Sequence, residues 1–380
     1  MLLNRVGSHT KTSGGLAKAA LPYVDAAGSE TLQVYVSNSR GWALPPGDPA
    51  QDVLFRDGIG SREIPAYIHA SLLVNLGSPT ELTVERSAAV LAHALERGRD
   101  IGATAVVFHA GSSVDPAHED KAFHQLHEVL LPLLDRPGMP QLLVEPSAGG
   151  GRSLASKVQD LERYLDAVEN HPGLGVCFDT CHAWAAGHDL ATPGGMTATL
   201  DALVAAAGPG RLRLIHANDS KDECGSTRDR HESIGKGRIG AAPFAELLAH
   251  PAAAGVPVIV ETPTEEHEGH AADIALLKSL RPGAEVAPAT GAASAGRRRS
   301  DARRCPPGAP LLRSGSSDPV ARAWRLWTTP ECGQLGSPLR GRLGFPVPRS
   351  SLGGRGRRWP TGKRSSSCQC CVDNARMLAA

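Results

Sequence analysis

Eight short runs rich in β-branched and aliphatic residues recur along the first three quarters of the chain, and this recurrence is the strongest constraint on its fold. Stretches with helical periodicity separate the runs, for example Val84, Ala88, Leu91 and Leu95. Strands that alternate with helices form a parallel sheet. The eight predicted strands cover residues 5–10, 32–37, 66–74, 105–111, 141–146, 174–180, 212–218 and 256–263.

Several of these runs are apolar at consecutive positions, as in Ala105–Phe108 and Val258–Val260. Parallel strands that are buried on both faces show this pattern. Eight strand–helix units in roughly 280 residues match the usual size of a closed barrel. We therefore expect an α/β protein with a (β/α)8 TIM barrel. A doubly wound open sheet is the alternative, although no Gly-x-Gly-x-x-Gly motif stands between a strand and a helix, which disfavours its nucleotide-binding form.

The composition changes near residue 282 and divides the chain into two parts. Residues 1–282 carry 23 Lys and Arg against 34 Asp and Glu, whereas residues 283–380 carry 17 against 5. The second part is a low-complexity segment rich in Arg, Gly, Pro and Ser, and it lacks the large aliphatic residues that a core requires. We expect a barrel domain over 1–282 and a disordered tail over 283–380.

The cysteines and the first residues of the chain bear on its location. Only Cys177, Cys181 and Cys224 of the eight cysteines lie before residue 283, without the spacing of a disulfide framework. The opening segment turns polar too early for a secretion signal, and no apolar run approaches the roughly 20 residues of a membrane span. We expect a soluble, cytoplasmic protein that does not bind membranes.

Residues of the types that can bind metals, His, Asp and Glu, stand at the C-terminal ends of six of the predicted strands. In a (β/α)8 barrel these ends meet on one face, where active sites are built. One such His or Glu is more often a capped or solvated group than a ligand, but the same property at six strand ends is hard to obtain by chance. The candidate metal ligands are His69, His109, Glu145, Asp179, His182, His216 and Glu261, with Asp229 and His231 in the loop after the seventh strand.

Five imidazoles and four carboxylates in one place indicate bound divalent cations. The four carboxylates would repel each other in a buried cluster without a cation. Imidazole and carboxylate ligands suit zinc, manganese or iron, and nine ligands are too many for one tetrahedral ion but enough for three. Three divalent cations would leave a charge of about +2, which suits a phosphodiester, and such ions activate water for its hydrolysis.

Three segments resemble the signature segments of the endonuclease IV family. They are Gly175–His182 (GVCFDTCH), His216–Lys221 (HANDSK) and Asp229–Gly240 (DRHESIGKGRIG). Shorter similar segments at Gly7–His9 and His69–Gly77, and around Glu145 and Glu261, extend the resemblance over residues 1–282.

The resemblance implies a DNA-repair enzyme whose substrate is double-stranded DNA with abasic sites. The family hydrolyses the phosphodiester 5′ to the abasic site, leaves a 3′-hydroxyl and a 5′-deoxyribose phosphate, and also clears blocked 3′ ends. It uses three zinc ions per chain, with manganese as an alternative at one site. The implied ligand sets are His69, His109 and Glu145 for the first zinc, Glu145, Asp179, His216 and Glu261 for the second, and His182, Asp229 and His231 for the third. The implied catalytic carboxylates are Glu145, Asp179 and Glu261.

The resemblance also implies side chains that contact DNA. The family turns the abasic nucleotide out of the duplex and fills the gap with side chains from its loops. The expected DNA contacts are Lys11, Arg40, Leu72, Leu73 and Arg230. Relatives often carry an aromatic residue where Leu72 stands, so a stacking contribution of about 1–3 kcal/mol is absent here. Lys236 also differs from the family, which often has a carboxylate at that position.

Further cations lie in loops predicted to surround the metal ligands, as binding of a polyanion requires. They are Arg62, Arg152, Lys221, Arg228, Lys236 and Arg238. Scattered surface charge is the alternative for each of them. The tail, with 16 Arg and one Lys, is either a basic arm that raises non-specific DNA affinity or a frame-shifted translation of GC-rich sequence, and its composition favours the second.

Several other polar residues receive a structural interpretation. His93, His124 and His127 fall on helical segments and are predicted to be surface residues. The two cysteines that flank Asp179 are predicted to be packing residues. His9 ends the first strand, and it either contacts phosphate or supports a carboxylate ligand.

Two other functions stay open from the sequence. A sugar isomerase or epimerase on the same barrel also uses His, Glu and Asp with a divalent metal, but it needs only one or two ions and leaves Asp229 and His231 without a purpose. A DNA-binding module without activity would not need nine metal-binding residues. Counting metals per chain separates these functions from the endonuclease. No obligatory protein partner is inferred, and we expect a monomer that associates with the nucleoid if the source is bacterial.

Overall fold

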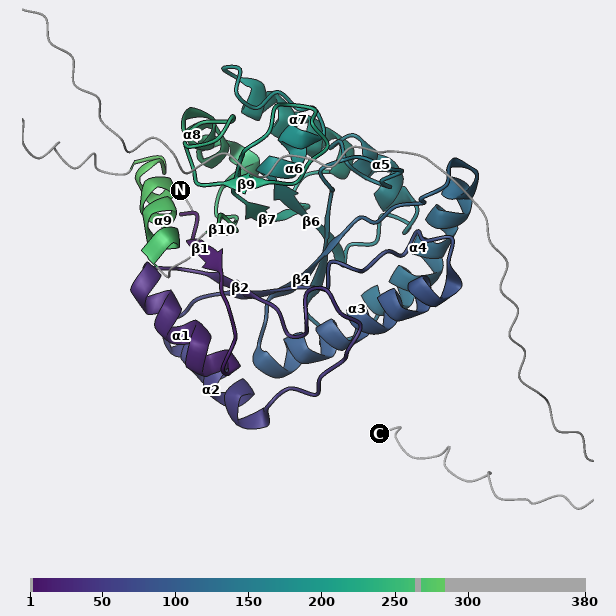
Figure 1. The fold of residues 1–380 in the computed structure, drawn as a ribbon, viewed down its shortest axis with the longest axis horizontal. Coiled ribbons are helices and arrows are strands. Elements are labelled where there is room, and N and C mark those ends of the chain that lie inside the picture. Colours follow the sequence, from purple (N-terminus) through teal and green to yellow (C-terminus); the bar gives the residue numbers. More distant parts are fainter. Residues whose placement is uncertain (1–2, 264–267, 284–380) are drawn as a thin grey trace, which may run out of the picture. The chain divides into compact units, whose positions relative to one another are not determined.

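A computed structural model of the protein describes residues 3–263 and 268–283. Within them, eight parallel strands close into a barrel in the order β1-β10-β7-β6-β5-β4-β3-β2 (Figure 1). The strands are β1 (Val6–His9), β2 (Leu32–Val34), β3 (Ala66–His69), β4 (Ala105–His109), β5 (Gln141–Glu145), β6 (Leu174–Asp179), β7 (Leu212–His216) and β10 (Val258–Val260). The predicted barrel is confirmed, and each of the eight predicted runs contains one strand.

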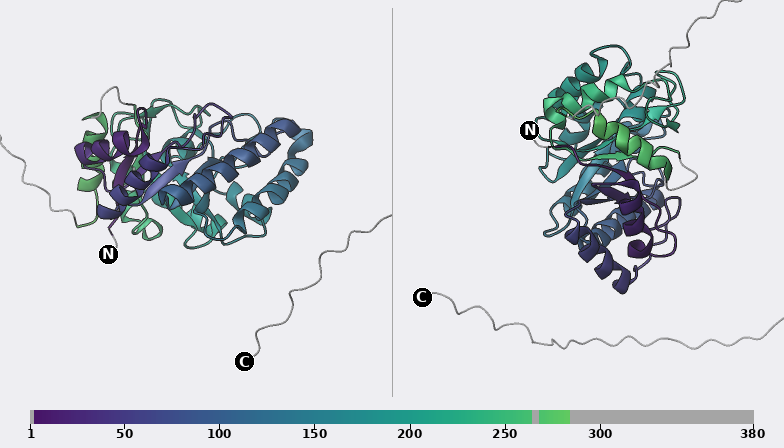
Figure 2. Two further views of the ribbon diagram at one scale, coloured as in Figure 1. Left: turned by 90° about the horizontal axis from the view of Figure 1, so that it is seen from below. Right: turned by 90° about the vertical axis from the view of Figure 1, so that its left-hand side faces the viewer.

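Helices surround the barrel on its outer side (Figure 1), and one short helix, α6, follows β6 directly at the C-terminal end of the barrel; Figure 2 gives two further views. They are α1 (Leu16–Ala27), α2 (Pro49–Ser61), α3 (Glu81–Ile101), α4 (Glu119–Leu134), α5 (Asp160–Asp166), α6 (Thr180–Ala185), α7 (Gly195–Ala207), α8 (Ala242–Ala249) and α9 (Glu268–Ser279). None of the helices in the described segments combines the length and apolarity needed to cross a bilayer.

The apolar strand residues divide into two buried layers because side chains alternate between the two faces of a strand. The larger layer lies between the strands and the helices and includes Val106, Phe108 and Val144. The smaller layer fills the inside of the barrel with Tyr67, Ala105, Val107, Leu143, Cys177, Leu214 and Ile259. Strands buried on both faces account for the consecutive apolar residues in the sequence.

The register of neighbouring strands brings the ends of the strands side by side. His109 lies opposite Glu145 in the β4–β5 pair, and Asp179 lies opposite His216 in the β6–β7 pair. Six strand ends therefore deliver their last side chains to one end of the barrel. This register is what places the candidate ligands together.

The barrel closes where β1 pairs with β10, with Gly7 opposite Ile259. A Cβ at Gly7 would overlap with the carbonyl oxygen of Thr31 on the other side of β1. Glycine is required here because the neighbouring backbone comes so close.

Three details differ from the sequence prediction. The strands end earlier than predicted, so the apolar residues Leu72–Val74 lie in a turn beyond β3. A two-stranded antiparallel sheet of β8 (Asp219–Ser220) and β9 (His231–Glu232) was not predicted. The predicted tail beyond residue 283, with its late cysteines, lies outside the described residues, and the domain boundary at 282 stays a prediction.

Candidate metal centre

The nine candidate ligands lie together at the C-terminal end of the barrel. Six of them end a strand or follow one directly, His182 lies in the short helix α6 after β6, and Asp229 and His231 lie next to β9 or on it. A cavity of about 320 Å³ opens over them, lined by six of the nine and by Lys11, Tyr35 and Leu72. The structure therefore brings together the residues that the sequence singled out.

Glu145 stands at the centre of this cluster and is fully buried. Its Oε2 atom lies 3.2 Å from His69 Nε2 and 3.7 Å from His109 Nε2. Its Oε1 atom lies 3.2 Å from His182 Nδ1 and 3.1 Å from His216 Nδ1. One carboxylate thus faces two groups of histidines, one on each oxygen, which is the placement that a bridging ligand requires.

Three subsets of the cluster have donor atoms close enough to share an ion. In each subset, one donor atom of every member lies within 4.8 Å of the others. The subsets are His69, His109 and Glu145, then Asp179, His216 and Glu261, then Asp179, His182 and His231. These groupings differ from the three ligand sets that the resemblance implies in two ways: Glu145 is absent from the second, and Asp179 takes the place of Asp229 in the third.

Backbone carbonyls fix the orientation of three of the histidine rings. His69 Nδ1 lies 2.7 Å from the carbonyl oxygen of Ala70, and His231 Nδ1 lies 3.1 Å from that of Glu261. His182 Nδ1 is 3.1 Å from the Pro146 carbonyl. A proton on each Nδ1 can be donated to a carbonyl, which leaves Nε2 as the ring atom that can bind an ion.

Ring nitrogens of the cluster point at carboxylate oxygens, an arrangement that is stable only with a proton or a metal ion between the two atoms. His182 Nε2 lies 3.3 Å from Asp229 Oδ2, and His231 Nε2 lies 2.8 Å from Asp229 Oδ1. His216 Nδ1 has oxygens of Glu145 and Glu261 at 3.1 and 3.3 Å. Lone pairs facing each other at these distances repel unless a proton or a metal ion lies between them. The nitrogen and oxygen donors fit divalent zinc or manganese.

Burial and neighbouring charged groups shift the pKa values of several residues in the cluster. Burial alone would raise the pKa of Glu145, but the surrounding histidines, His216 foremost, hold this pKa well below its ordinary value. Burial lowers the pKa of His109 to about 4. For His231, burial is outweighed by Asp229 and Asp179, which raise the pKa to about 9. Glu145 thus stays ionised, and His231 holds a proton that a metal ion can replace.

The two cysteines beside Asp179 lie close to the cluster but act as packing residues. Cys177 and Cys181 are fully buried, and burial raises the pKa of each thiol to about 12. Cys177 belongs to the apolar layer inside the barrel. Because a thiol must lose its proton to bind zinc, these residues favour the protonated, non-ligating form.

The loop that carries Asp229 is held in place by the aspartates that follow β7. The buried side chain of Asp222 pairs with Arg228, at 2.8 Å, and with Arg230. The buried Asp219 accepts hydrogen bonds from the backbone of residues 235–240. Asp229 itself is 47% exposed in its side chain and so lies at the open mouth of the cluster.

Two of the residues expected to contact DNA line the mouth of the cluster, and one of the further cations lies away from it. Lys11 and Leu72 line the cavity over the cluster, and Leu72 is 38% exposed. The backbone of Leu72 bonds to Ser39, next to Arg40, which joins the loops after β2 and β3. The placement of Arg62 near the ligands was wrong, because Arg62 follows α2 and precedes β3, at the opposite end of the barrel.

Sequence reasoning left His9 open and missed Gln33 and Tyr35. His9 Nδ1 lies 3.1 Å from Glu261 Oε1, so the structure supports its role beside a carboxylate ligand. Tyr35 lines the cavity, and its ring lies 4.4 Å from that of His9. Gln33 contacts two candidate ligands. The one available signal was a polar residue in the middle of an apolar strand.

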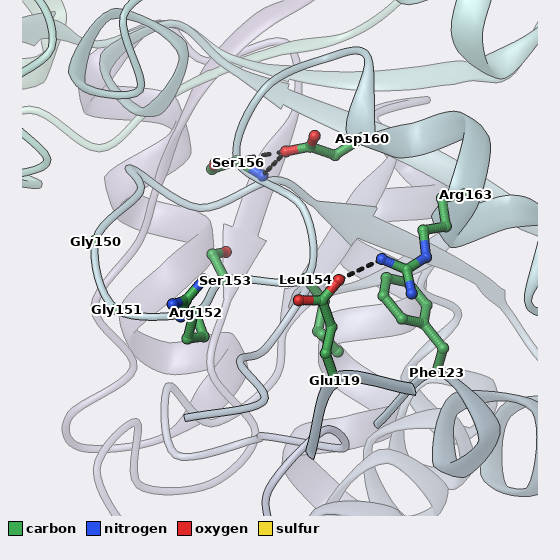
Figure 3. A pocket seen from close by; sticks show the side chains of 10 residues that line it. All are labelled: Glu119, Phe123, Gly150, Gly151, Arg152, Ser153, Leu154, Ser156, Asp160 and Arg163. Atoms are coloured by element: carbon green, nitrogen blue, oxygen red, sulfur yellow. Dashed lines mark hydrogen bonds and ion pairs between the residues drawn. The ribbon is translucent and has the colours of Figure 1, made fainter. Parts of the chain in front are cut away.

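A second pocket, of about 260 Å³, lies beside the loop that follows β5 (Figure 3). Arg152 and Ser153 come from that loop, and Glu119 and Phe123 come from α4. Arg163 of α5 pairs with Glu119 and lies over the ring of Phe123, with Cζ 4.0 Å from the ring centre. The pocket shares no residue with the nine candidate ligands.

Comparison with known proteins identifies the family. Residues 21–280 match the family described as Xylose isomerase-like TIM barrel. A probable endonuclease 4 of Streptomyces avermitilis is 52% identical over 283 residues, which cover 74% of this chain and 91% of that protein. The chain belongs to the endonuclease 4 family. A second member, from Methanoculleus marisnigri, is 36% identical over 282 residues and 98% of its length.

Solved structures agree with this membership. The crystal structure of endonuclease IV from Thermus thermophilus has a TM-score of 0.63 and 33% identity, and the match covers 73% of this chain and 98% of that one. A D-tagatose 3-epimerase-like protein has a TM-score of 0.56 at 17% identity, over 73% of this chain and 96% of that one. The second likeness concerns the fold alone, so the endonuclease 4 family shares its barrel with sugar epimerases.

Proposed function

We propose that this member of the endonuclease 4 family is a zinc-dependent DNA-repair enzyme that hydrolyses the phosphodiester 5′ to abasic sites. The products would be a 3′-hydroxyl and a 5′-deoxyribose phosphate, and blocked 3′ ends are a second class of substrate. The observation that carries the proposal is the cluster of nine imidazoles and carboxylates around Glu145, at the mouth of the barrel.

We assign three zinc ions to this cluster, with manganese as an alternative at one position. His69 and His109 would hold the first ion and His182, Asp229 and His231 the third, in agreement with where their donor atoms meet. The second would lie among Asp179, His216 and Glu261. When bound, such ions supply an activated water and stabilise the leaving oxygen of a phosphodiester.

The protein's own contribution is to hold these groups in place before DNA arrives. The carboxylates Glu145, Asp179 and Glu261 are the proposed catalytic residues, because they lie among the donor atoms that would hold the first and second ions. Burial of Glu145 and Asp179 excludes water from their sides. Backbone carbonyls and buried hydrogen bonds fix the rings, so little reorganisation is needed during the reaction.

The loops around the mouth would bind the damaged duplex. Leu72, exposed beside the cavity, and Leu73 would enter the space left by the missing base, with Arg40 from the neighbouring loop. Lys11 and Arg230 would neutralise phosphates, which makes the affinity dependent on salt concentration. The pairing of Arg230 with Asp222 orients this cation but leaves its side chain 55% exposed.

The test is cleavage of a duplex oligonucleotide that contains one tetrahydrofuran abasic analogue. The purified full-length chain is assayed as isolated, after prolonged chelation, and after zinc is restored, with the metal content measured in each state. We expect a single cut 5′ to the lesion, lost on chelation and regained with zinc. His231→Gln should lose activity, whereas His124→Gln, on the exposed surface of α4, should retain it.

A sugar isomerase or epimerase is the alternative on the same barrel. It predicts one or two metals per chain, no cut in the damaged duplex, and little effect of changes at Asp229 and His231. A folded, metal-loaded protein that leaves the lesion intact would rule out the endonuclease, and a content of one or two metals per chain would then favour this alternative.

A further inference from the structure

Gln33 is a buried polar residue on β2, one of the two barrel strands that supply no candidate ligand. It has no exposed surface. It lies opposite His9 in the β1–β2 pair and opposite Tyr67 in the β2–β3 pair. A buried amide is costly unless its polar atoms form hydrogen bonds, so its partners indicate why it is there.

Both ends of the Gln33 amide contact candidate metal ligands. The Nε2 atom lies 2.7 Å from Glu261 Oε1, and the Oε1 atom lies 2.9 Å from His216 Nε2. The chemistry fixes this orientation, because a rotated amide would place its oxygen against the Glu261 carboxylate. The amide therefore donates to Glu261, and His216 Nε2 must carry the proton that Gln33 Oε1 accepts.

These two contacts determine which atoms remain for a metal ion. With its proton on Nε2, the neutral ring of His216 has its lone pair on Nδ1, the atom that faces Glu145 and Glu261. Glu261 Oε1 is held by Gln33 and by His9, at 2.7 and 3.1 Å, and Oε2 lies 3.3 Å from His216 Nδ1. His216 Nδ1 and Glu261 Oε2 are thus directed at the same point.

The other histidines of the cluster do not depend on Gln33. His69, His182 and His231 have their Nδ1 atoms bonded to backbone carbonyls. In His216 the two ring nitrogens exchange roles: Nε2 forms the supporting hydrogen bond, and its partner is the side chain of Gln33 instead of a backbone carbonyl. A change at Gln33 can therefore act on one of the three proposed ion positions and leave the other two unaffected.

We propose that Gln33 is a positioning residue for the metal ion held by Asp179, His216 and Glu261, through its hydrogen bonds to the last two. The inference rests on the proposed metal centre. Partners of ligand side chains commonly change metal affinity about 10- to 100-fold when they are removed. Loss of the amide should weaken this one ion position by a factor in that range.

The experiment follows the release of metal from the full-length, zinc-loaded protein in buffers of graded free zinc. Gln33→Met keeps the length of the side chain and removes both hydrogen bonds. Gln141→Met is the matched control, because Gln141 begins β5 at the other end of the barrel. Metal per chain is measured by mass spectrometry, and the melting temperature of each metal-free protein is recorded.

We expect Gln33→Met to lose one zinc ion per chain at about 10- to 100-fold higher free zinc than the wild type. The other two ions of Gln33→Met should be released at the same free zinc concentration as in the wild type. All three ions of Gln141→Met should do the same. The visible spectrum after cobalt replacement should change in Gln33→Met alone. If that variant does not fold, Gln33→Asn, whose shorter amide cannot reach both partners, supplies the same measurement.

Release curves that overlap with the wild type would overturn the inference, and so would loss of all three ions together with a lower melting temperature of the metal-free form. The latter result would mean that Gln33 only packs the barrel. Selective loss of one ion in a protein that does not cut abasic DNA would leave this inference standing and remove the proposed activity. If the protein cuts abasic DNA and Gln33→Met releases zinc as the wild type does, the proposed activity would stand and this inference would be overturned.

Discussion

Asp219 illustrates how one buried carboxylate shapes the mouth of the metal centre. Its Oδ2 atom accepts hydrogen bonds from the backbone N–H groups of Gly235, Gly237 and Gly240 at 2.9–3.2 Å. Its Oδ1 atom accepts from Ser220 and Ile239. A loop of small residues is thus wound around a single side chain. Its first residues follow directly on β9, which carries His231.

Replacement of Asp219 by Asn should loosen this loop without opening the barrel. The amide has one acceptor oxygen instead of two, so at least two backbone donors lose their partner, at a cost of about 1–3 kcal/mol. Hydrogen exchange should become faster at residues 235–240, and urea unfolding should show the lower stability. Asp201→Asn, at an exposed side chain, is the control. Unchanged exchange in Asp219→Asn would contradict this account.

Leu72 lies exposed beside the cavity, at a position where the family resemblance implies an aromatic residue. Leu72→Trp should tighten binding to a duplex with an abasic site by about 1–3 kcal/mol, which corresponds to roughly fivefold to a hundredfold, because the indole can stack on a neighbouring base. Fluorescence anisotropy with metal-loaded protein measures the effect. Leu82→Trp, exposed on α3, should bind as the wild type does. Equal gains in both variants would argue against a specific role of Leu72.

The residues of the site were predictable where they end a strand and unpredictable where they support a ligand. His69, His109 and Glu145 stand out because a metal-binding side chain follows an apolar run. Gln33 was missed, since only the closed barrel places its amide against residues more than 180 positions away. Arg62 was misplaced because its loop was assigned to the wrong end of the barrel.

At the scale of elements, α2 and α3 are joined by a buried ion pair. Arg97 of α3 holds both oxygens of Asp52 in the first turn of α2, at 2.8 and 2.6 Å. Both side chains are at least nine-tenths buried. A guanidinium with both bonds satisfied in this way is stable, but either charge left alone would be strongly unfavourable.

Asp52→Ala should therefore destabilise the protein by about 3–5 kcal/mol, because the buried Arg97 loses both of its close carboxylate contacts and keeps only Asp100, at 3.6 Å. The matched control is Asp25→Ala. Asp25 pairs with Arg62 in a similar two-bond geometry, but it is 56% exposed, so the loss should stay below about 1 kcal/mol. Urea denaturation measures both variants. Similar losses in the two would show that burial does not govern these pairs.

The elements themselves were predictable because barrel strands and surface helices differ in periodicity. The apolar positions from Val84 to Leu95 fall within α3. The helix α5 spans only Asp160–Asp166, and the buried side chains of Val158 and Val168 lie in the turns that flank it. The short β8–β9 pair escaped prediction, since two residues are too few to show alternation.

At the scale of the whole molecule, the proposed ions should contribute to stability as well as to catalysis. A ligand that binds only the folded state stabilises it by about 4 kcal/mol at a thousandfold excess over its Kd. Chelation should therefore lower the Tm of the full-length protein in calorimetry, and added zinc should restore it. His231→Gln should show a smaller shift. An unchanged Tm after complete removal of metal would contradict a role of the cluster in holding the strand ends together.

The pairing of β1 with β10 has a consequence for how the chain is made. The first strand of the barrel to be synthesised, β1, pairs with the last strand of the barrel, β10. On its other side, β10 pairs with β7. About 40 residues separate His216 from Val258, and their synthesis at about 5–20 residues per second takes about 2–8 s. During that interval two strand edges have no neighbour, and unpaired edges invite association with other chains. A nascent chain that stalls before Val258 should therefore be a preferred client of chaperones.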